Sequence, residues 1–190
     1  MAYQQIPTRT SSDTAIPYQD TNQIQDNFDI IFDSNGKIFN LPFPATQVPS
    51  ADANTLDDYE EGTWTPGVTF GGLSTNVTYY TQYNKGFYTK VGNLVSITGQ
   101  LSLTSNGSAT GVAKITGLPF TNYNNEAAIC APGIYSSGVT FANQLGAYLS
   151  QNDNAIALRE TTEAGVPTAL TEGDLSDSTS IVINLTYRTA

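Results

Sequence analysis

The residues best suited to chemistry form one short acidic block. It places four carboxylates within five residues: Asp57, Asp58, Glu60 and Glu61. On a loop, such a block could hold a hard cation such as Ca²⁺ through oxygen ligands, or it could form a solvated or salt-bridged surface at a subunit boundary. Its spacing matches no calcium-loop pattern. We therefore expect the second arrangement, with Trp64, the only tryptophan, packed at the base of the domain that follows.

The chain has no histidine. This excludes Ser-His and Cys-His nucleophilic pairs, histidine zinc sites and histidine acid–base catalysis. Carboxylate chemistry remains open, but residues 62–125 contain no Asp or Glu. A glycosidase would need two carboxyl groups roughly 5 to 9.5 Å apart, and the candidates are the acidic block, Asp153, Glu160 and Glu163. We expect no enzymatic activity and no cofactor.

The charge of the chain limits its partners. Seventeen acidic residues oppose seven basic ones, for a net charge of −10, and the basic residues form no cluster. Nucleic acid and anionic membranes are therefore not expected as partners. No apolar run approaches the roughly 18 to 20 residues of a membrane span, and the N-terminus lacks a signal-peptide pattern. We expect synthesis in a cytoplasm without export by a signal peptide.

Cys130 is the single cysteine. It cannot form an intrachain disulfide, and the usual cysteine spacings of metal sites are absent. Between Ile129 and Ala131 it is expected to be a small core residue, with a reactive thiol as the alternative.

The first 56 residues divide into three segments. Residues 1–19 are polar and interrupted by prolines, which predicts an extended arm, either an anchor on a neighbouring protein or a tail ordered only by its own subunit. Residues 20–36 are expected to form a short helix and a turn. Residues 37–56 begin with a short strand and continue as a Pro-rich linker. One apolar stripe marks the helix at i, i+4 and i+7: Ile24, Phe28 and Ile31. A helix this short must bury that stripe, either on its own domain or around a three-fold axis.

Residues 57–190 are typical of an antiparallel β-sandwich or jelly roll, because short alternating strands are separated by Gly and Asn turns. The clearest hairpin joins residues 87–91 to residues 94–103 through Gly92-Asn93. In its second strand Val95, Ile97, Gly99, Leu101 and Leu103 share one face. We also expect strands at 68–70, 77–83, 112–116, 127–131, 139–142, 144–150, 155–159 and 180–187. Loops are expected to carry Glu160, Glu163, Glu172, Asp174 and Asp177.

The opposite face of the second hairpin strand is uncharged. It carries Ser96, Thr98, Gln100 and Ser102. It is either the ordinary solvent side of a sheet, which we favour, or a surface suited to sugars. The aromatic residues proposed for such glycan contacts are Tyr79, Tyr80, Tyr83 and Tyr88, although alternation should bury about half of them.

Three motifs together resemble a known module. The segment 56–66 (LDDYEEGTWTP), with 88–93 (YTKVGN) and 115–120 (ITGLPF), is similar to a small β-rich module of tailed-bacteriophage tail fibres, head fibres and related appendages. The resemblance covers roughly residues 50–125, and residues 22–27 (NQIQDN) extend it weakly. It implies a trimeric structural protein of the virion that is anchored by its N-terminus to other virion proteins.

Within that resemblance several functions stay open. The β domain could attach to a polysaccharide of the host surface. It could instead serve as a capsid decoration or adaptor protein without a receptor. A glycan-degrading appendage enzyme is the least favoured alternative.

Overall fold

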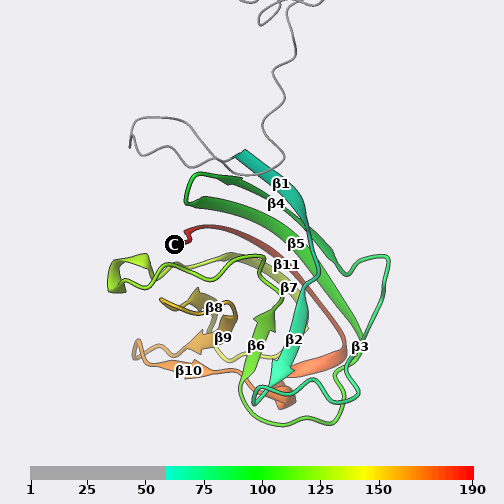
Figure 1. Cartoon of the computed structure of the whole chain (residues 1–190). Helices are drawn as coiled ribbons and strands as arrows, with labels where there is room; N and C mark the ends of the chain where they lie inside the picture. The colour runs from blue at the N-terminus through cyan, green and yellow to red at the C-terminus, as the bar shows by residue number, and fades with distance from the viewer. Residues whose placement is uncertain (1–58) are drawn as a thin grey trace, which may run out of the picture. The chain divides into compact units, whose positions relative to one another are not determined.

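The computed structural model of this chain describes residues 59–190. The predicted arm, the helix with Ile24, Phe28 and Ile31, the linker, and Asp57 and Asp58 lie outside the described residues. The described part is mainly β, as predicted, and its strands form two antiparallel sheets that pack face to face (Figure 1).

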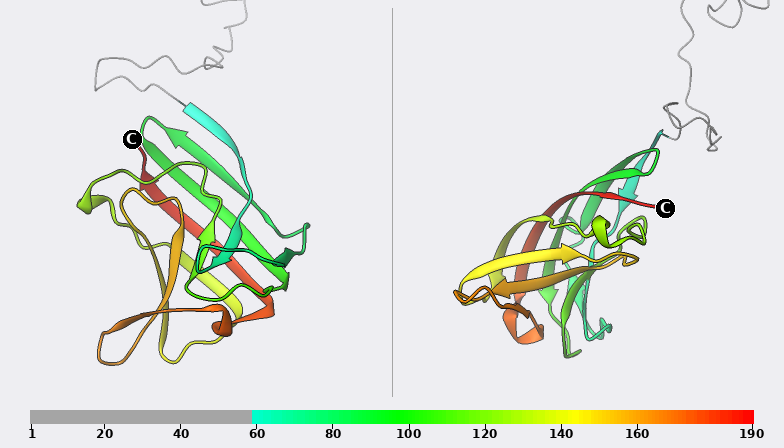
Figure 2. Two further views of the ribbon diagram at one scale, coloured as in Figure 1. Left: turned by 60° about the horizontal axis from the view of Figure 1, so that its bottom comes forward. Right: turned by 90° about the vertical axis from the view of Figure 1, so that its left-hand side faces the viewer.

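The larger sheet contains six strands. Five of them follow the order β1 (Tyr59–Trp64), β4 (Lys85–Val91), β5 (Leu94–Ser105), β11 (Leu175–Arg188) and β7 (Gly133–Val139), and β3 (Thr78–Tyr79) pairs with β5. In the smaller sheet β2 (Gly67–Phe70) pairs with β6 (Ala113–Thr116), which pairs with β9 (Ile156–Thr161). Strands β8 (Gln144–Leu149) and β10 (Pro167–Ala169) also pair with β9. The two sheets form the layers visible in Figure 2.

The central hairpin forms as the sequence predicts. Val91 pairs with Leu94, which leaves Gly92-Asn93 as a two-residue turn with Gly92 at φ +57°. This left-handed conformation costs glycine little because it lacks a Cβ. The alternating face of β5 is buried as expected, since Val95, Ile97, Leu101 and Leu103 are each at most 1% exposed.

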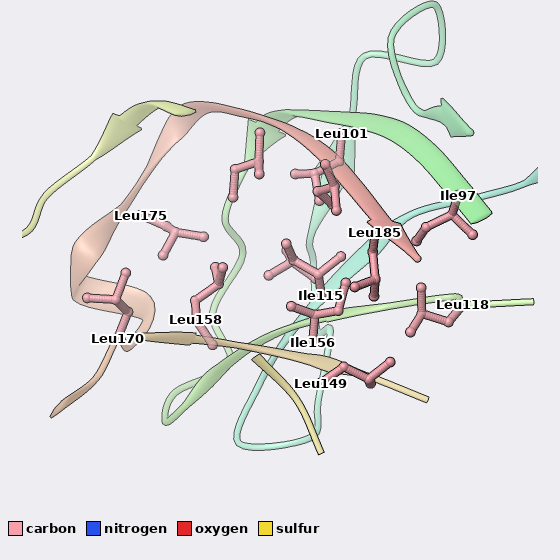
Figure 3. Packing of buried hydrophobic residues seen from close by; sticks show 14 of the residues in the cluster. Ile97, Leu101, Ile115, Leu118, Leu149, Ile156, Leu158, Leu170, Leu175 and Leu185 are labelled. Carbon is pink, nitrogen blue, oxygen red and sulfur yellow. The ribbon is translucent and has the colours of Figure 1, made fainter. Parts of the chain in front are cut away.

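The hydrophobic core fills the space between the two sheets (Figure 3). Ile97, Leu101 and Leu185 come from the larger sheet, and they face side chains of the smaller sheet that include Ile115, Ile156 and Leu158. Burying a side chain of this kind contributes roughly 1.5–3 kcal/mol. The alternation of apolar residues in β5 and β11 therefore explains how the larger sheet is held against the smaller one.

Three predicted strands were wrong in extent or type. Over 77–83 only Thr78–Tyr79 is a strand, and a turn follows in which the Tyr83 N–H bonds to the Tyr80 carbonyl. In place of a strand at 127–131 there is a 3₁₀ turn, η1 (Glu126–Ala128), because the Asn125 side chain accepts from the Ala127 N–H and caps it. The strand predicted at 139–142 is the end of β7, which stops at Val139.

The prediction that five carboxylates lie in loops was correct for only some of them. Glu172 and Asp174 lie in a second 3₁₀ turn, η2 (Glu172–Asp174), and Glu163 lies in the turn before β10. Glu160 instead belongs to β9 and Asp177 to β11. The described residues 59–190 contain no helix long and apolar enough to cross a membrane.

Candidate functional site

Trp64 anchors the start of the larger sheet, as the sequence predicts. It ends β1, is 5% exposed, and pairs in register with Gly86 of β4. Gly86 in turn pairs with Gly99 of β5. The indole lies across both glycines on the inner face: a Cβ at Gly86 would overlap the indole, and one at Gly99 would lie 2.6 Å from its Cζ2 atom. The two glycines therefore make room for the only tryptophan.

The acidic block does not form a loop where the structure describes it. Glu60 and Glu61 lie in β1, the edge strand of the larger sheet, which corrects the loop prediction. Glu60 accepts a hydrogen bond from the Tyr88 hydroxyl at 2.5 Å, and this bond, followed by burial, raises the pKa of Tyr88. Charged side chains on an edge strand oppose pairing with another sheet. The described half of the block thus protects an edge and binds a neighbouring tyrosine.

The other predicted carboxylates hold loops together. Asp153 forms an ion pair with Lys114 at 2.9 Å and accepts from the N–H groups of Asn154 and Ala155. Glu160 accepts from the Ala142 N–H at 2.6 Å. Glu172, Asp174 and Asp177 accept from the N–H groups of Gly111, Thr171 and Asn106 respectively. Among residues 59–190, no group of three or more His, Cys, Asp or Glu side chains could hold a metal ion.

Cys130 is half-buried and packs against the core, as expected for a small core residue. Its backbone pairs with Leu149, and its thiol donates to the Ala128 carbonyl at 2.9 Å. Burial raises the pKa of the Cys130 thiol, which lowers its thiolate fraction at neutral pH and hence its reactivity.

The four tyrosines proposed for glycan contacts lie in different places. Tyr79 and Tyr88 are half-buried against the core, where the Tyr79 hydroxyl accepts from the Val68 N–H at 2.8 Å. Burial is the main reason that the pKa of Tyr79 is raised. The Tyr88 ring meets Phe120 edge to face at 5.4 Å between centroids. Tyr80 and Tyr83 are 53% and 44% exposed, in and beside the turn after β3. The set is therefore not one surface.

The outer face of the larger sheet is the broadest candidate surface. In-register pairs place their side chains on the same side of a sheet, so two adjacent rows follow from the strand pairing. One row runs Phe87, Thr98, Asn184. The other runs Gln100, Val182, Tyr135 and has Lys85 in register with Gln100 at its β4 end. We call the six residues other than Lys85 the outer strip. It includes two of the four predicted polar residues of β5, Thr98 and Gln100, whereas Ser102 is only 9% exposed.

Two aromatic residues of the outer strip were missed by the sequence reasoning. Phe87 is 59% exposed and Tyr135 is 73% exposed. Phe87 was assigned to the correct hairpin, and its alternation with Tyr88 could have placed it outward. Tyr135 could not be placed, because its strand, β7, was predicted several residues too late.

Comparison with known proteins supports the fold. No family model matches the sequence, and no curated protein matches it. Among solved structures, the chain is similar to the crystal structure of Dettilon tailspike protein (gp208), with a TM-score of 0.57 and 18% sequence identity. The similarity covers 68% of this chain and 24% of that tailspike chain. At this identity the likeness is one of fold, and it concerns about a quarter of the tailspike.

Proposed function

We propose that this chain is a non-enzymatic structural protein of a tailed-phage virion. In this proposal it forms a short trimeric appendage that is held by its N-terminal segment and carries the β-sandwich outward. The observation that carries the proposal is the fold shared with part of a tailspike protein over 68% of the chain. The resemblance of residues 56–66, 88–93 and 115–120 to an appendage module comes from a different kind of comparison and points the same way.

The contacts of the carboxylates support a non-enzymatic role. Of those proposed for acid–base catalysis, Asp153 is paired with Lys114 and caps a turn, and Glu160 binds the Ala142 N–H. A catalytic carboxylate needs access to a substrate, whereas these two are occupied by backbone and lysine partners. Release of reducing ends from an envelope polysaccharide by the purified protein would contradict this part of the proposal.

The oligomeric state provides the first test. We expect light scattering after size exclusion to give the mass of three copies for the full chain and for residues 57–190. Three copies in both would place the trimer contact in the β domain. A single copy in both would contradict the trimeric appendage and favour a decoration or adaptor protein that the particle assembles.

Attachment is tested separately. Deleting residues 1–45 should abolish incorporation into particles, while the β domain keeps the buried fluorescence of Trp64, which is 5% exposed in the structure. Normal incorporation of the shortened chain would contradict N-terminal anchoring.

A further inference from the structure

The outer strip is uncharged although the protein is strongly acidic. On the outer face of the larger sheet the charged residues are Glu61, Lys85 and Arg188, which lie at its margins in β1, at the start of β4 and at the end of β11. The whole chain carries −10. Among residues 59–190, Lys85 is the only charged residue in register with the strip, so the strip itself suits a ligand without charge.

Polar side chains separate Phe87 from the other apolar group of the strip, the neighbouring pair Val182 and Tyr135. Phe87 is flanked across the strands by Thr63 and Thr98, and Tyr135 lies beyond Val182. The cores of homodimer interfaces are about 65% apolar and continuous. Small apolar groups set apart by hydroxyls and amides do not fit a stable contact between subunits. They fit a ligand whose own surface alternates between apolar and polar groups.

Two polar groups of the strip are available for a ligand. The Thr98 hydroxyl and the Asn184 amide make no hydrogen bond within the part of the chain that the structure describes. Asn184 lies over Gly133 of β7, where a Cβ would come within 2.5 Å of its Oδ1 atom. Glycine at position 133 thus allows this amide to lie along the sheet. An amide both donates and accepts hydrogen bonds, as ligand hydroxyls require.

The aromatic residues are spaced for an extended ligand. Phe87 belongs to β4 and Tyr135 to β7, which are three strand positions apart in the order β4-β5-β11-β7. At ~4.8 Å per strand this separates their backbones by about 14 Å, with Thr98 and Asn184 between them. A single sugar ring cannot reach both aromatic side chains, whereas an oligosaccharide can lie across the strip.

We infer that the outer strip binds a neutral polysaccharide. Phe87 and Tyr135 pack against the apolar faces of two sugar rings, and Thr98 and Asn184 bond to the hydroxyls between them. The inference rests on the proposed function and supplies the ligand class for the appendage. It moves the glycan surface from the tyrosines at positions 79, 80, 83 and 88 to the six residues of the outer strip.

Affinity electrophoresis of the full chain tests the inference, with dextran, mannan, galactan and arabinogalactan as neutral probes and polygalacturonate as an acidic one. We expect at least one neutral polymer to retard the protein and polygalacturonate to have no effect. The double variant Phe87→Ala/Tyr135→Ala should weaken the retardation by at least about tenfold, equivalent to ~1.4 kcal/mol. Asn184→Ala should weaken it several-fold. Both aromatic side chains are more than half exposed, so the fold should tolerate their removal.

The matched control is Tyr80→Ala/Tyr83→Ala, which removes two exposed aromatic residues outside the strip. Its retardation should equal that of the unchanged protein. The inference is overturned if no neutral polymer retards the chain, or if the control loses binding and the strip variant keeps it. The inference is also overturned if the strip variant becomes monomeric, because the strip is then a contact between subunits. That result would leave the proposed appendage function standing.

Discussion

The indole N–H of Trp64 donates to the carbonyl oxygen of Thr98 at 3.1 Å, joining residues 34 positions apart. The bond links the edge strand β1 to β5, the second strand beyond it, across the glycine at position 86. The backbone of Thr98 is thereby held from the inner face, while its side chain belongs to the outer strip.

Gly99→Ala should destabilise the domain, because the added methyl group would lie 2.6 Å from the Trp64 ring. Overpacking of this kind costs roughly 1–3 kcal/mol. The measurement is the free energy of unfolding in urea. Gly146→Ala is the control, since its Cβ would have no neighbour nearer than 3.9 Å, and it should be neutral or slightly stabilising. Equal effects of the two substitutions would refute this account.

Trp64→Phe should lower the free energy of unfolding by about 1–3 kcal/mol, because it loses the bond to the Thr98 carbonyl and leaves part of the indole's volume empty. Chemical denaturation monitored by far-ultraviolet circular dichroism measures the change. In the unchanged protein this sole tryptophan should shift its fluorescence to longer wavelength on unfolding. No shift would mean that the indole is already exposed.

Asp153 should contribute more through its backbone contacts than through its ion pair with Lys114. The side chains of that pair are 28% and 41% exposed, respectively, so Lys114→Met should cost less than about 1 kcal/mol. Asp153→Ala also removes the acceptor of two N–H groups and should cost about 1–2 kcal/mol. Asp153→Asn keeps an acceptor oxygen and should resemble Lys114→Met in thermal unfolding. The idea fails if the Asn and Ala variants are equally unstable.

Stability should fall in strong alkali because of Tyr187. This residue is 2% exposed and donates to the Phe120 carbonyl at 3.0 Å. Burial raises the pKa of Tyr187 to about 12 from 10.0. The unfolded chain therefore loses this proton first as pH rises. The stabilisation is complete below pH 10 and is lost between about pH 10 and 12.

The control for this pH dependence is Tyr187→Phe, which should be less stable at neutral pH but decline less steeply from pH 10 to 12. Urea unfolding at a series of pH values compares the two slopes. Parallel slopes would exclude Tyr187 as the source.

Sequence patterns correctly predicted those parts of the fold that depend on residues close together in the chain. The hairpin over 87–103 forms as predicted because the turn at Gly92-Asn93 and the alternation of β5 agree. Residues 77–83 alternate equally well, yet only Thr78–Tyr79 finds a partner strand. The partners of Trp64 could not be read from the sequence either, since Gly86 and Gly99 are distant in it and only strand pairing brings them under the ring.

The same limit applies to the candidate surface. The uncharged face of β5 was visible in the sequence, but its neighbours on β11 and β7 depend on the strand order. Strand β7 pairs with β11 and not with β8. Tyr135 therefore lies on the same face of the larger sheet as Phe87. The alternation of residues in a strand predicts which face of the sheet a side chain lies on. The order of the strands decides which other side chains lie beside it on that face.

The position of β1 also determines how the domain would resist mechanical force. Its six residues pair in register with β4, from Tyr59 with Val91 to Trp64 with Gly86. A pull on the chain before Tyr59, directed along the strand, would load this ladder in shear, so that the pairs resist together instead of opening one at a time. The buried indole at the far end would have to slide over two glycines before β1 could move. A domain tethered through β1 should therefore resist a force along the strand far better than a force that pulls β1 away from β4 one pair at a time.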